Sequence, residues 1–173
     1  METEPARDRA GWVDDPGLFA AWAGPALLPM SRLARRLAPS ADPDDLVQDA
    51  LSRAWQKRSQ YDAARGTATT WLLAIVADQA RASRRRGNRW LRVVDDSAEI
   101  PDVAVEDANA DVDLERAIGQ LADRQQLAVH LHYFVGLSVD ETASVMDCTT
   151  GTVKSTLFDA RRRLRVLLGD DDD

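Results

Sequence analysis

Apolar residues recur at intervals of three and four along most of this 173-residue chain, the spacing of helices that each bury one face. The clearest groups are Leu46, Ala50 and Ala54; Trp71, Leu72, Ile75 and Val76; Leu114, Ala117, Ile118 and Leu121; and Leu127, Leu131 and Phe134. Alternating apolar and polar runs bounded by turn residues, the pattern of strands, are missing from the sequence. The pattern predicts an all-α fold.

The segment from Leu137 to Arg165 predicts two helices joined by a tight turn. Ser138 can cap the first helix while Glu141, three residues later, returns a hydrogen bond to the cap amide. Asp147 stands where the turn needs a residue that tolerates left-handed backbone angles, and Thr149 can cap the second helix. This order predicts a helix-turn-helix whose second helix enters a DNA groove.

The second helix of this motif has two different sides. Val153, Leu157, Ala160 and Leu164 form an apolar stripe that can pack inward. Off the stripe lie residues that a DNA partner could contact, among them Lys154, Ser155, Phe158, Arg161, Arg162 and Arg165. A helical hairpin with a merely solvated basic face is the alternative, but it does not require helix, short turn and basic helix at this separation.

A second readable block, DPDDLVQDALSRAW, predicts a helix in the N-terminal half. Asp42 can cap it, Pro43 suits its first position, and Asp44 and Asp45 lie near the positive end of the helix dipole. One face is apolar, and the other carries Asp45, Gln48, Asp49 and Arg53. That polar face suits either solvent or a protein partner, and composition alone favours solvent.

A polar loop, Ser59 to Thr67, leads into a predicted helix from Thr70 to Arg86. Six arginines follow its apolar start, more than a helix C-terminus needs for its dipole: Arg81, Arg84, Arg85, Arg86, Arg89 and Arg92. Tyr61, Trp71 and Trp90 lie near them in sequence, and aromatic rings beside basic groups suit the stacking of unpaired bases. For Trp71, a place in the core remains an equal alternative.

The net charge of -7 hides a separation of sign along the chain. Ser31 to Arg92 holds 13 basic and 6 acidic residues, whereas Val93 to Glu115 holds 9 acidic residues and no basic one. Because the Debye length is about 8 Å at physiological salt, acid on a separate segment barely cancels a distant basic face. The acidic total therefore does not exclude nucleic acid. High charge, Pro101 and little periodicity predict that Val93 to Asp113 is a flexible linker between two small helical domains.

The remaining features bound the chemistry. The one cysteine, Cys148, excludes an internal disulfide, and the sequence shows neither a signal peptide nor an apolar run that could insert into a membrane, so we expect a cytoplasmic protein. His130, His132 and Cys148 make a poor metal site, because the two histidines point to different helix faces and a fourth ligand is missing. We expect no catalytic residues, no metal and no cofactor.

The motifs D-D-L-V-Q-D and L-S-x-x-E-x-A with G-T-V-K-S, in this order, resemble those of an extracytoplasmic-function (ECF) sigma factor of the sigma-70 family. The resemblance covers about Leu18 to Leu168. It implies a non-enzymatic subunit that directs core RNA polymerase to specific promoters and helps to open them. Its implied partners are the β′ and β subunits of core polymerase, promoter DNA and an anti-sigma factor. A stand-alone helix-turn-helix regulator is the alternative, for which the D-D-L-V-Q-D helix would be unnecessary.

The resemblance also implies which parts act. Residues 16–92 resemble sigma region 2, 93–113 the acidic linker, and 114–168 sigma region 4. Core polymerase would bind Asp45, Leu46, Val47, Gln48 and Asp49. The minus-ten element, with a flipped base in a pocket, would be read by Tyr61, Trp71, Asp78, Gln79, Arg81, Arg84, Arg85 and Arg86. The minus-thirty-five element would be read by Thr152, Lys154, Ser155, Phe158, Asp159, Arg161 and Arg162.

The chain departs from the family pattern at a few of these positions. Asp78 stands where the family usually has Asn, and Ala82 where it often has Asp. Thr156 and Asp159 occupy positions that are often basic, although Asp159 could accept a hydrogen bond from a cytosine amino group. The promoter sequence therefore stays open. Separately, Pro25 and Pro29 are expected to break or kink the first helices.

In the resemblance the acidic linker runs through the polymerase near the start site, where its charge would mimic that of RNA. Replacing the nine acidic residues between Val93 and Glu115 with Ser should therefore impair initiation while sparing the binding of core polymerase. Run-off transcription and a core-binding assay on the same variant measure the two effects separately. Unchanged initiation would contradict charge mimicry.

Overall fold

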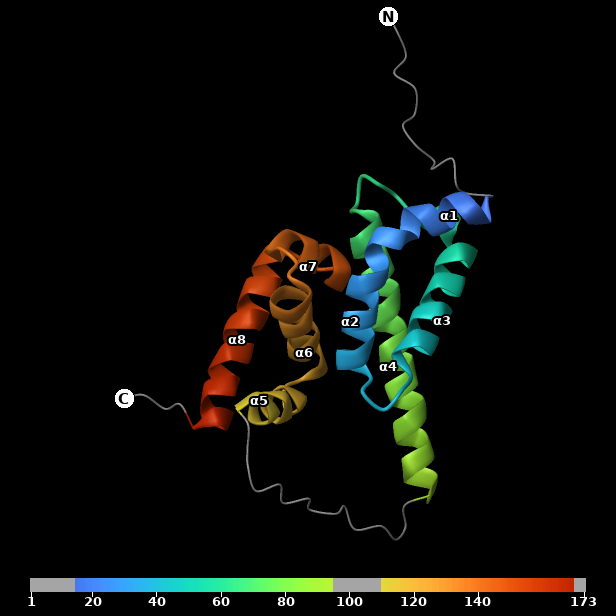
Figure 1. The fold of residues 1–173 in the computed structure, drawn as a ribbon. Coiled ribbons are helices and arrows are strands. Elements are labelled where there is room, and N and C mark those ends of the chain that lie inside the picture. The colour runs from blue at the N-terminus through green and yellow to red at the C-terminus, as the bar shows by residue number, and fades with distance from the viewer. Residues whose placement is uncertain (1–14, 95–109, 170–173) are drawn as a thin grey trace, which may run out of the picture.

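The computed structural model describes residues 15–94 and 110–169, with the backbone alone at 86–94 and 110–111. Within these ranges the regular structure is helical and no strand occurs, which confirms the all-α prediction (Figure 1). The predicted linker falls mostly on residues 95–109, outside the described part. No helix in the described ranges is both long and apolar enough to cross a bilayer.

The first helical body consists of the elements from α1 to α4. These are α1 (Pro16–Ala23), the 3₁₀ turn η1 (Gly24–Ala26), α2 (Leu27–Leu37), α3 (Pro43–Gln56), the 3₁₀ turn η2 (Arg58–Gln60) and α4 (Ala68–Val94). Helix α4 packs against both α2 and α3, and the fully buried Met30, Leu33, Leu72 and Val76 fill the space between them. Burial of each such side chain contributes about 1.5–3 kcal/mol, so the apolar stripes fix how these helices pack.

The second helical body consists of the elements from α5 to α8. These are α5 (Ala110–Gly119), α6 (Asp123–Val129), the π-helix η3 (His130–Val135), α7 (Val139–Met146) and α8 (Thr150–Leu168). Helix α8 packs against α5, α6 and α7, and its core side chains are Val153, Leu157 and Ala160, as the stripe predicts.

The predicted helix caps at Asp42 and Ser138 both form. The Asp42 carboxylate accepts hydrogen bonds from the amides of Asp44 (2.8 Å) and Asp45 (3.4 Å). Ser138 Oγ accepts from the Glu141 amide at 3.1 Å, and the Glu141 carboxylate accepts from the Ser138 amide at 2.8 Å. Each cap satisfies amides that have no partner inside the helix, so local sequence alone sets where these helices begin.

The helix-turn-helix also forms as predicted. Asp147 adopts a φ of 47°, the left-handed conformation that the turn requires. Thr149 then caps α8 by accepting a hydrogen bond from the Thr152 amide at 3.2 Å. Cys148 lies half-buried against the core between the two helices, in agreement with a packing role.

Helix α4 is longer than predicted, and the predicted break in the first helices occurs at Pro25. Helix α4 runs from Ala68 to Val94 instead of from Thr70 to Arg86, because its arginines favour helix and one glycine, Gly87, does not end it. Helix α5 begins at Ala110, four residues before Leu114. Pro25 lies in η1 and separates α1 from α2. Pro29 causes no break, since it is the third residue of α2, where its missing N–H would have had no partner in the helix.

The two bodies lie side by side and pack against each other along a seam (Figure 1). In this seam η3 lies on α2, and α7 lies on α4. Arg36 of α2 reaches across this seam to pair with Glu115 of α5, and its guanidinium carbon lies 3.5 Å from the centre of the Phe134 ring. The side chain therefore combines an ion pair with a cation–π contact. Nothing in the local sequence pattern of either body predicts this contact.

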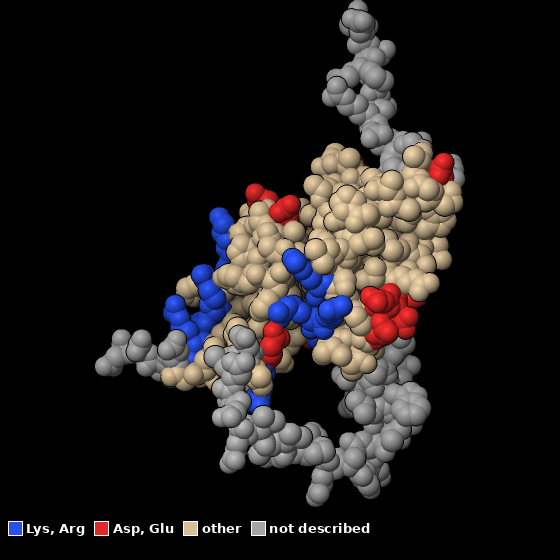
Figure 2. Space-filling model, in the orientation of Figure 1, with Lys and Arg blue, Asp and Glu red and all other residues tan. Residues whose placement is uncertain are grey.

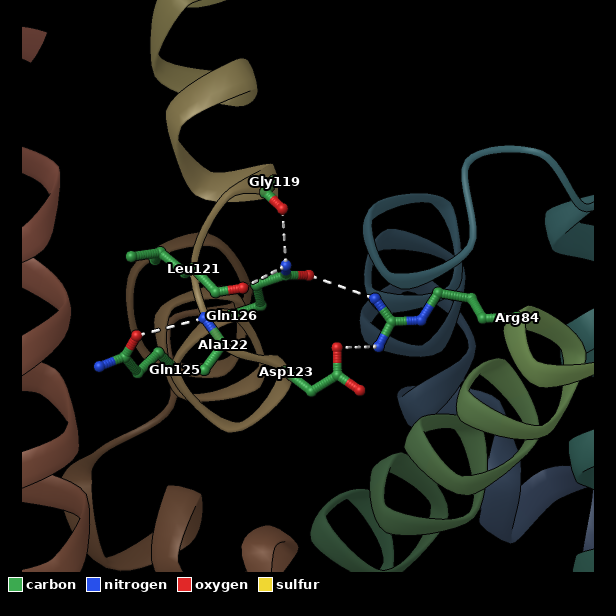
Figure 3. A network of polar contacts seen from close by, with 7 residues as sticks. All are labelled: Arg84, Gly119, Leu121, Ala122, Asp123, Gln125 and Gln126. Carbon is green, nitrogen blue, oxygen red and sulfur yellow. Dashed lines mark hydrogen bonds and ion pairs between the residues drawn. The ribbon is translucent and has the colours of Figure 1, made fainter. Parts of the chain in front are cut away.

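Arg84 makes a second connection across the seam, shown in Figure 3. One nitrogen lies 3.0 Å from the Asp123 carboxylate, and another donates to the Gln126 side-chain oxygen at 3.2 Å. The amide nitrogen of Gln126 donates to the carbonyls of Leu121 (2.8 Å) and Gly119 (3.1 Å), so Gln126 ties the turn between α5 and α6 to α4. Because Asp123 is mostly exposed, the ion pair itself contributes about 1 kcal/mol or less.

His130 is buried at the same seam, only 2% exposed, and its ring contacts Phe134 with the two centres 5.6 Å apart. Its Nδ1 has no hydrogen-bond partner among the described residues. Burial, followed by the positive charge of Arg36, lowers the pKa of His130 from 6.5 to about 4, against an opposing effect of Glu115. The folded protein therefore holds this imidazole neutral near pH 7.

This buried histidine makes stability depend on pH. Between pH 6.5 and about 4 the unfolded chain binds a proton at this position and the folded chain does not, so the free energy of unfolding falls as the pH falls. From pH 7.5 to 5 this loss should be about 2 kcal/mol. Urea unfolding of the wild type and of His130→Gln at both pH values gives the change in the free energy of unfolding for each protein, and the wild type should lose about 2 kcal/mol more than the variant. An equal loss of stability in the two proteins would contradict the burial of a neutral imidazole.

Candidate DNA and protein interfaces

The outer face of α8 is a basic surface on the second body. Every predicted contact residue there except Thr152 is exposed, and Thr152 is half-buried: Thr152, Lys154, Ser155, Phe158, Asp159, Arg161 and Arg162. Phe158 is 60% exposed, although burial of a phenylalanine is strongly favourable. Figure 2 shows blue side chains along the edge of the molecule that α8 forms. An exposed helix face with this composition is suited to a DNA groove.

Three side-chain hydrogen bonds lie at the start of α8. Thr149 caps the helix and Thr152 lies in its first turn, and their hydroxyls are hydrogen-bonded at 2.9 Å. Ser155 Oγ and Thr156 Oγ1 donate to the Thr152 carbonyl at 3.0 and 2.7 Å. In this structure Ser155 therefore uses its hydroxyl within the helix, while Lys154 and Phe158 project freely.

Tyr61 and Trp71 belong to an aromatic cluster on the first body. The ring centres of Tyr61 and Trp71 lie 5.5 Å apart, and Trp22 of α1 lies 5.1 Å from Tyr61 and 6.1 Å from Trp71, all in edge-on arrangements. Both candidate residues are only half-buried. Trp71 thus packs in part against the core and is in part accessible, which is compatible with either of the two alternatives. The sequence analysis did not predict that Trp22 belongs to this cluster. The only indication in the sequence is an aromatic residue in an apolar helix.

The loop before α4 is held in one conformation. The Tyr61 hydroxyl donates to the Gly66 carbonyl at 3.3 Å, and Thr67 Oγ1 accepts from the Thr70 amide at 3.2 Å. Thr70 is buried, and its hydroxyl donates to the Thr67 carbonyl at 2.9 Å. This loop therefore carries Tyr61 beside the start of α4 on a fixed backbone.

The polar side of α4 carries the other predicted minus-ten residues. Asp78 pairs with Arg81 at 3.1 Å, Arg85 is exposed, and Gln79 is half-buried. Arg84 is occupied by the seam contacts, and the Arg86 side chain lies outside the described part. A cavity of about 750 Å³ lies between this surface and the second body. It is lined by Trp71, Asp78 and Arg81 on one side and by the turn of the helix-turn-helix on the other.

The outer face of α3 is acidic. Asp45, Gln48 and Asp49 are exposed, Val47 is half-buried, and red side chains gather at this side of the first body in Figure 2. Leu46 is 5% exposed and packs in the core. Of the five predicted contact residues, Leu46 therefore fixes the helix from inside while the polar ones face outward.

No three His, Cys, Asp or Glu side chains come together as a possible metal site in the ranges that the structure describes. His130 and His132 lie apart in environment, since His130 is buried and the His132 Nδ1 lies 2.8 Å from the Leu137 carbonyl.

Comparison with known families explains why these surfaces occur together. A model of sigma-70 region 2 matches residues 28–90, and a model of sigma-70 region 4 matches residues 111–164. The ECF RNA polymerase sigma factor SigL of Mycobacterium tuberculosis (strain H37Rv) is 31% identical over 144 residues, which cover 79% of this chain and 81% of SigL. The chain belongs to the ECF sigma-factor family.

Other relatives agree with this membership. The ECF sigma factor SigK of Mycolicibacterium vanbaalenii is 28% identical over 134 residues, covering 73% of this chain and 68% of SigK. The sigma factor RpoE of Bartonella quintana, solved with the anti-sigma factor NepR, has a TM-score of 0.68 at 28% identity, covering 89% of this chain and 98% of RpoE. CnrH, solved with the cytosolic domain of CnrY, shares the fold, with a TM-score of 0.66 at 24% identity and 92% of each chain covered.

The loop that carries Tyr61 yields a stability test in this ECF sigma factor. A Cβ at Gly66 would lie 2.7 Å from Thr70 Oγ1, which is buried and hydrogen-bonded, so Gly66→Ala should lower the free energy of unfolding by about 1–3 kcal/mol. Gly24→Ala is the matched control, since a Cβ there meets nothing within 4 Å and the backbone is already helical. Chemical denaturation of both variants measures the difference. Equal stabilities would contradict the described loop.

Proposed function

We propose that this ECF sigma factor directs core RNA polymerase to specific promoters, assists their opening and performs no bond chemistry itself. The observation that carries the proposal is the presence, in one chain of this family, of an outward acidic face on α3 and an outward basic reading face on α8. A protein that joins an enzyme to DNA needs both. It would act in the cytoplasm, where polymerase and chromosome meet.

Helix α3 is the proposed docking element for the polymerase. Its start is fixed by the Asp42 cap, and its inner residues Leu46, Ala50 and Ala54 are buried, so Asp45, Gln48 and Asp49 are held on a rigid helix. Rigid presentation lowers the conformational entropy lost on binding. We assign this face to the β′ subunit, with the β subunit as a further contact of the assembled polymerase.

The loop before α4 and the outer side of α4 are the proposed minus-ten reader. Extruding a base costs a few kcal/mol of stacking, which ring contacts and phosphate neutralisation must offset. The half-buried Tyr61 and Trp71 can supply the ring contacts, while Arg81, Arg84 and Arg85 can supply positive charge. We assign base reading to Asp78 and Gln79, and we count Arg86 among the basic residues of this reader.

Helix α8 is the proposed minus-thirty-five reader in the major groove. Lys154 and Phe158 can reach base edges, where Phe158 suits a thymine methyl group and Asp159 suits a cytosine amino group. Arg161 and Arg162 would contact phosphates, which set position without reading sequence. Thr152 and Ser155 lie at the helix start, closest to the groove floor in this docking mode.

The closed packing of the two bodies cannot read both promoter elements at once. Helix α7 of the helix-turn-helix lies on α4, so the two proposed readers are neighbours. Elements centred near -10 and -35 are about 25 base pairs apart, roughly 85 Å at 3.4 Å per base pair. We infer that the seam opens when the protein docks on polymerase, and that the free protein binds promoter DNA weakly.

An anti-sigma factor is a proposed partner of the closed form. The RpoE structure of Bartonella quintana, to which this chain is similar over most of its length, contains the anti-sigma factor NepR. A protein that binds both bodies at once would hold the seam shut and keep α4 covered. Identity of that partner is a question for co-purification.

A stand-alone helix-turn-helix regulator is the second candidate, and the α3 face separates the two. Asp45→Asn with Asp49→Asn should weaken binding to core polymerase at least about tenfold, since these carboxylates are exposed and available to a basic partner. Ala20→Lys with Ala21→Lys changes the net charge equally on exposed positions of α1 and is the control. Affinity measurement with purified core polymerase gives both values.

A gel-shift assay with promoter fragments, found by mapping start sites after run-off transcription, completes the test. We expect tight, specific binding only when core polymerase is present. Tight specific binding by the protein alone, with both charge variants behaving alike towards polymerase, would support the regulator instead.

A further inference from the structure

A cavity of about 750 Å³ lies at the seam, separate from the one beside Trp71. Its first wall is formed by arginines of the first body: Arg32, Arg35 and Arg36 of α2 and Arg84 of α4. Elements α5, α6 and η3 of the second body form the other wall. Figure 2 shows blue side chains gathered over α2 where the two bodies meet. The cavity is therefore basic and shared by both bodies.

The charge of this cavity is not balanced. Four arginines line it, against one carboxylate, that of Glu115. Arg36 is paired with Glu115 and Arg84 with Asp123, whereas Arg32 and Arg35 are exposed and have no ion-pair partner within the described residues. Guanidinium groups gathered in a concave site repel one another and raise the local concentration of anions.

The opposite wall also carries a buried polar atom without a hydrogen-bond partner among the described residues. His130 lines the cavity, is 2% exposed, and its Nδ1 has no hydrogen-bond partner in the part of the chain that is described. Buried polar atoms without partners are rare in folded proteins and mark places where a water, ion or ligand belongs. Since the imidazole is neutral, it can offer a hydrogen bond without adding to the positive charge.

We propose that this cavity binds a small molecule carrying two or more linked phosphate groups, and that the bound anion joins the two bodies. The planar guanidinium group matches phosphate oxygens in pairs, which makes arginine clusters suited to this chemistry. The volume lies within the range of sites that hold one small ligand. Arg32 and Arg35 supply the free charge, and the exposed Gly119 is among the residues that line the second wall.

A ligand held by α2 and α4 on one side and by the second body on the other would stabilise the closed packing. It binds only the form in which both walls meet, so it shifts the equilibrium towards that form. The binding test requires neither polymerase nor promoter, so its failure leaves the proposed sigma function untouched, and failure of that function leaves the binding site untouched.

Isothermal titration of the full chain with inorganic tripolyphosphate, at about 0.15 M salt, tests the site. We expect one tripolyphosphate per chain, and Arg32→Ser with Arg35→Ser should weaken binding by about tenfold or more, because charge-assisted bonds are lost. A parallel titration with GDP identifies the source: equal affinity means that the phosphate chain suffices, and higher affinity means that a nucleoside is also recognised.

Two matched controls decide between this site and general attraction to basic protein. Arg163→Ser with Arg165→Ser removes the same charge from exposed positions of α8 and should leave the affinity within about twofold. Gly119→Glu adds a carboxylate to the second wall, where a Cβ meets nothing within 4 Å, and should weaken binding, whereas Gly119→Gln should not. Circular dichroism of each variant checks that the helices remain.

The proposal is overturned by any of three results. One is no measurable binding of tripolyphosphate at millimolar concentration. Another is equal weakening by the α2 and α8 arginine pairs, which would show nonspecific attraction. The third is tighter binding of a poly-aspartate peptide than of tripolyphosphate, which would assign the cavity to an acidic protein segment.

Discussion

Helix α4 packs against the core of the first body on one side and against the second body on the other, and the rest of the structure depends on this double packing. Its apolar side, with Leu72, Leu73 and Val76, is buried against α2 and α3 and makes the first body a unit. Its polar side lies against α7. On the same side Arg84 pairs with Asp123 and donates a hydrogen bond to Gln126, both in α6. The surface proposed to read promoter DNA therefore faces the protein's own second body. Core packing is strong and permanent, whereas the partly solvated polar contacts are weak enough to exchange.

The sequence predicted whatever is decided locally. Caps at Asp42, Ser138 and Thr149 need only residues within three positions, and the stripe of α8 needs only its period, so these predictions are confirmed. The exposed face of α8 followed from the same period. The seam could not be predicted, because Arg36 and Glu115 are 79 residues apart and Arg84 and Gln126 are 42 apart. No local pattern encodes such pairings, and the same holds for Trp22 beside Trp71.

Charge separation gives the proposed surfaces different tasks. Carboxylates gather on the outside of α3, arginines on α8 and on α2 beside the seam, so each face favours a different kind of partner (Figure 2). The acidic net charge conceals this arrangement because local fields are screened over short distances. The sequence placed Leu46 on the polymerase-binding face by resemblance, whereas its burial gives it a supporting place behind Asp45 and Asp49. Motif matching identifies a helix, and burial then distinguishes the residues that face a partner.

The central claim is that a closed molecule opens on the polymerase, and one distance tests it most directly. Dyes attached at Ala20→Cys on α1 and Arg163→Cys on α8, both exposed positions, in a Cys148→Ser background would report the separation of the two bodies by energy transfer. The account predicts a single short distance in the free protein and an increase of several tens of Å on core polymerase with promoter, as two elements roughly 85 Å apart require. An unchanged distance on the polymerase, or an equally long one in the free protein, would contradict it.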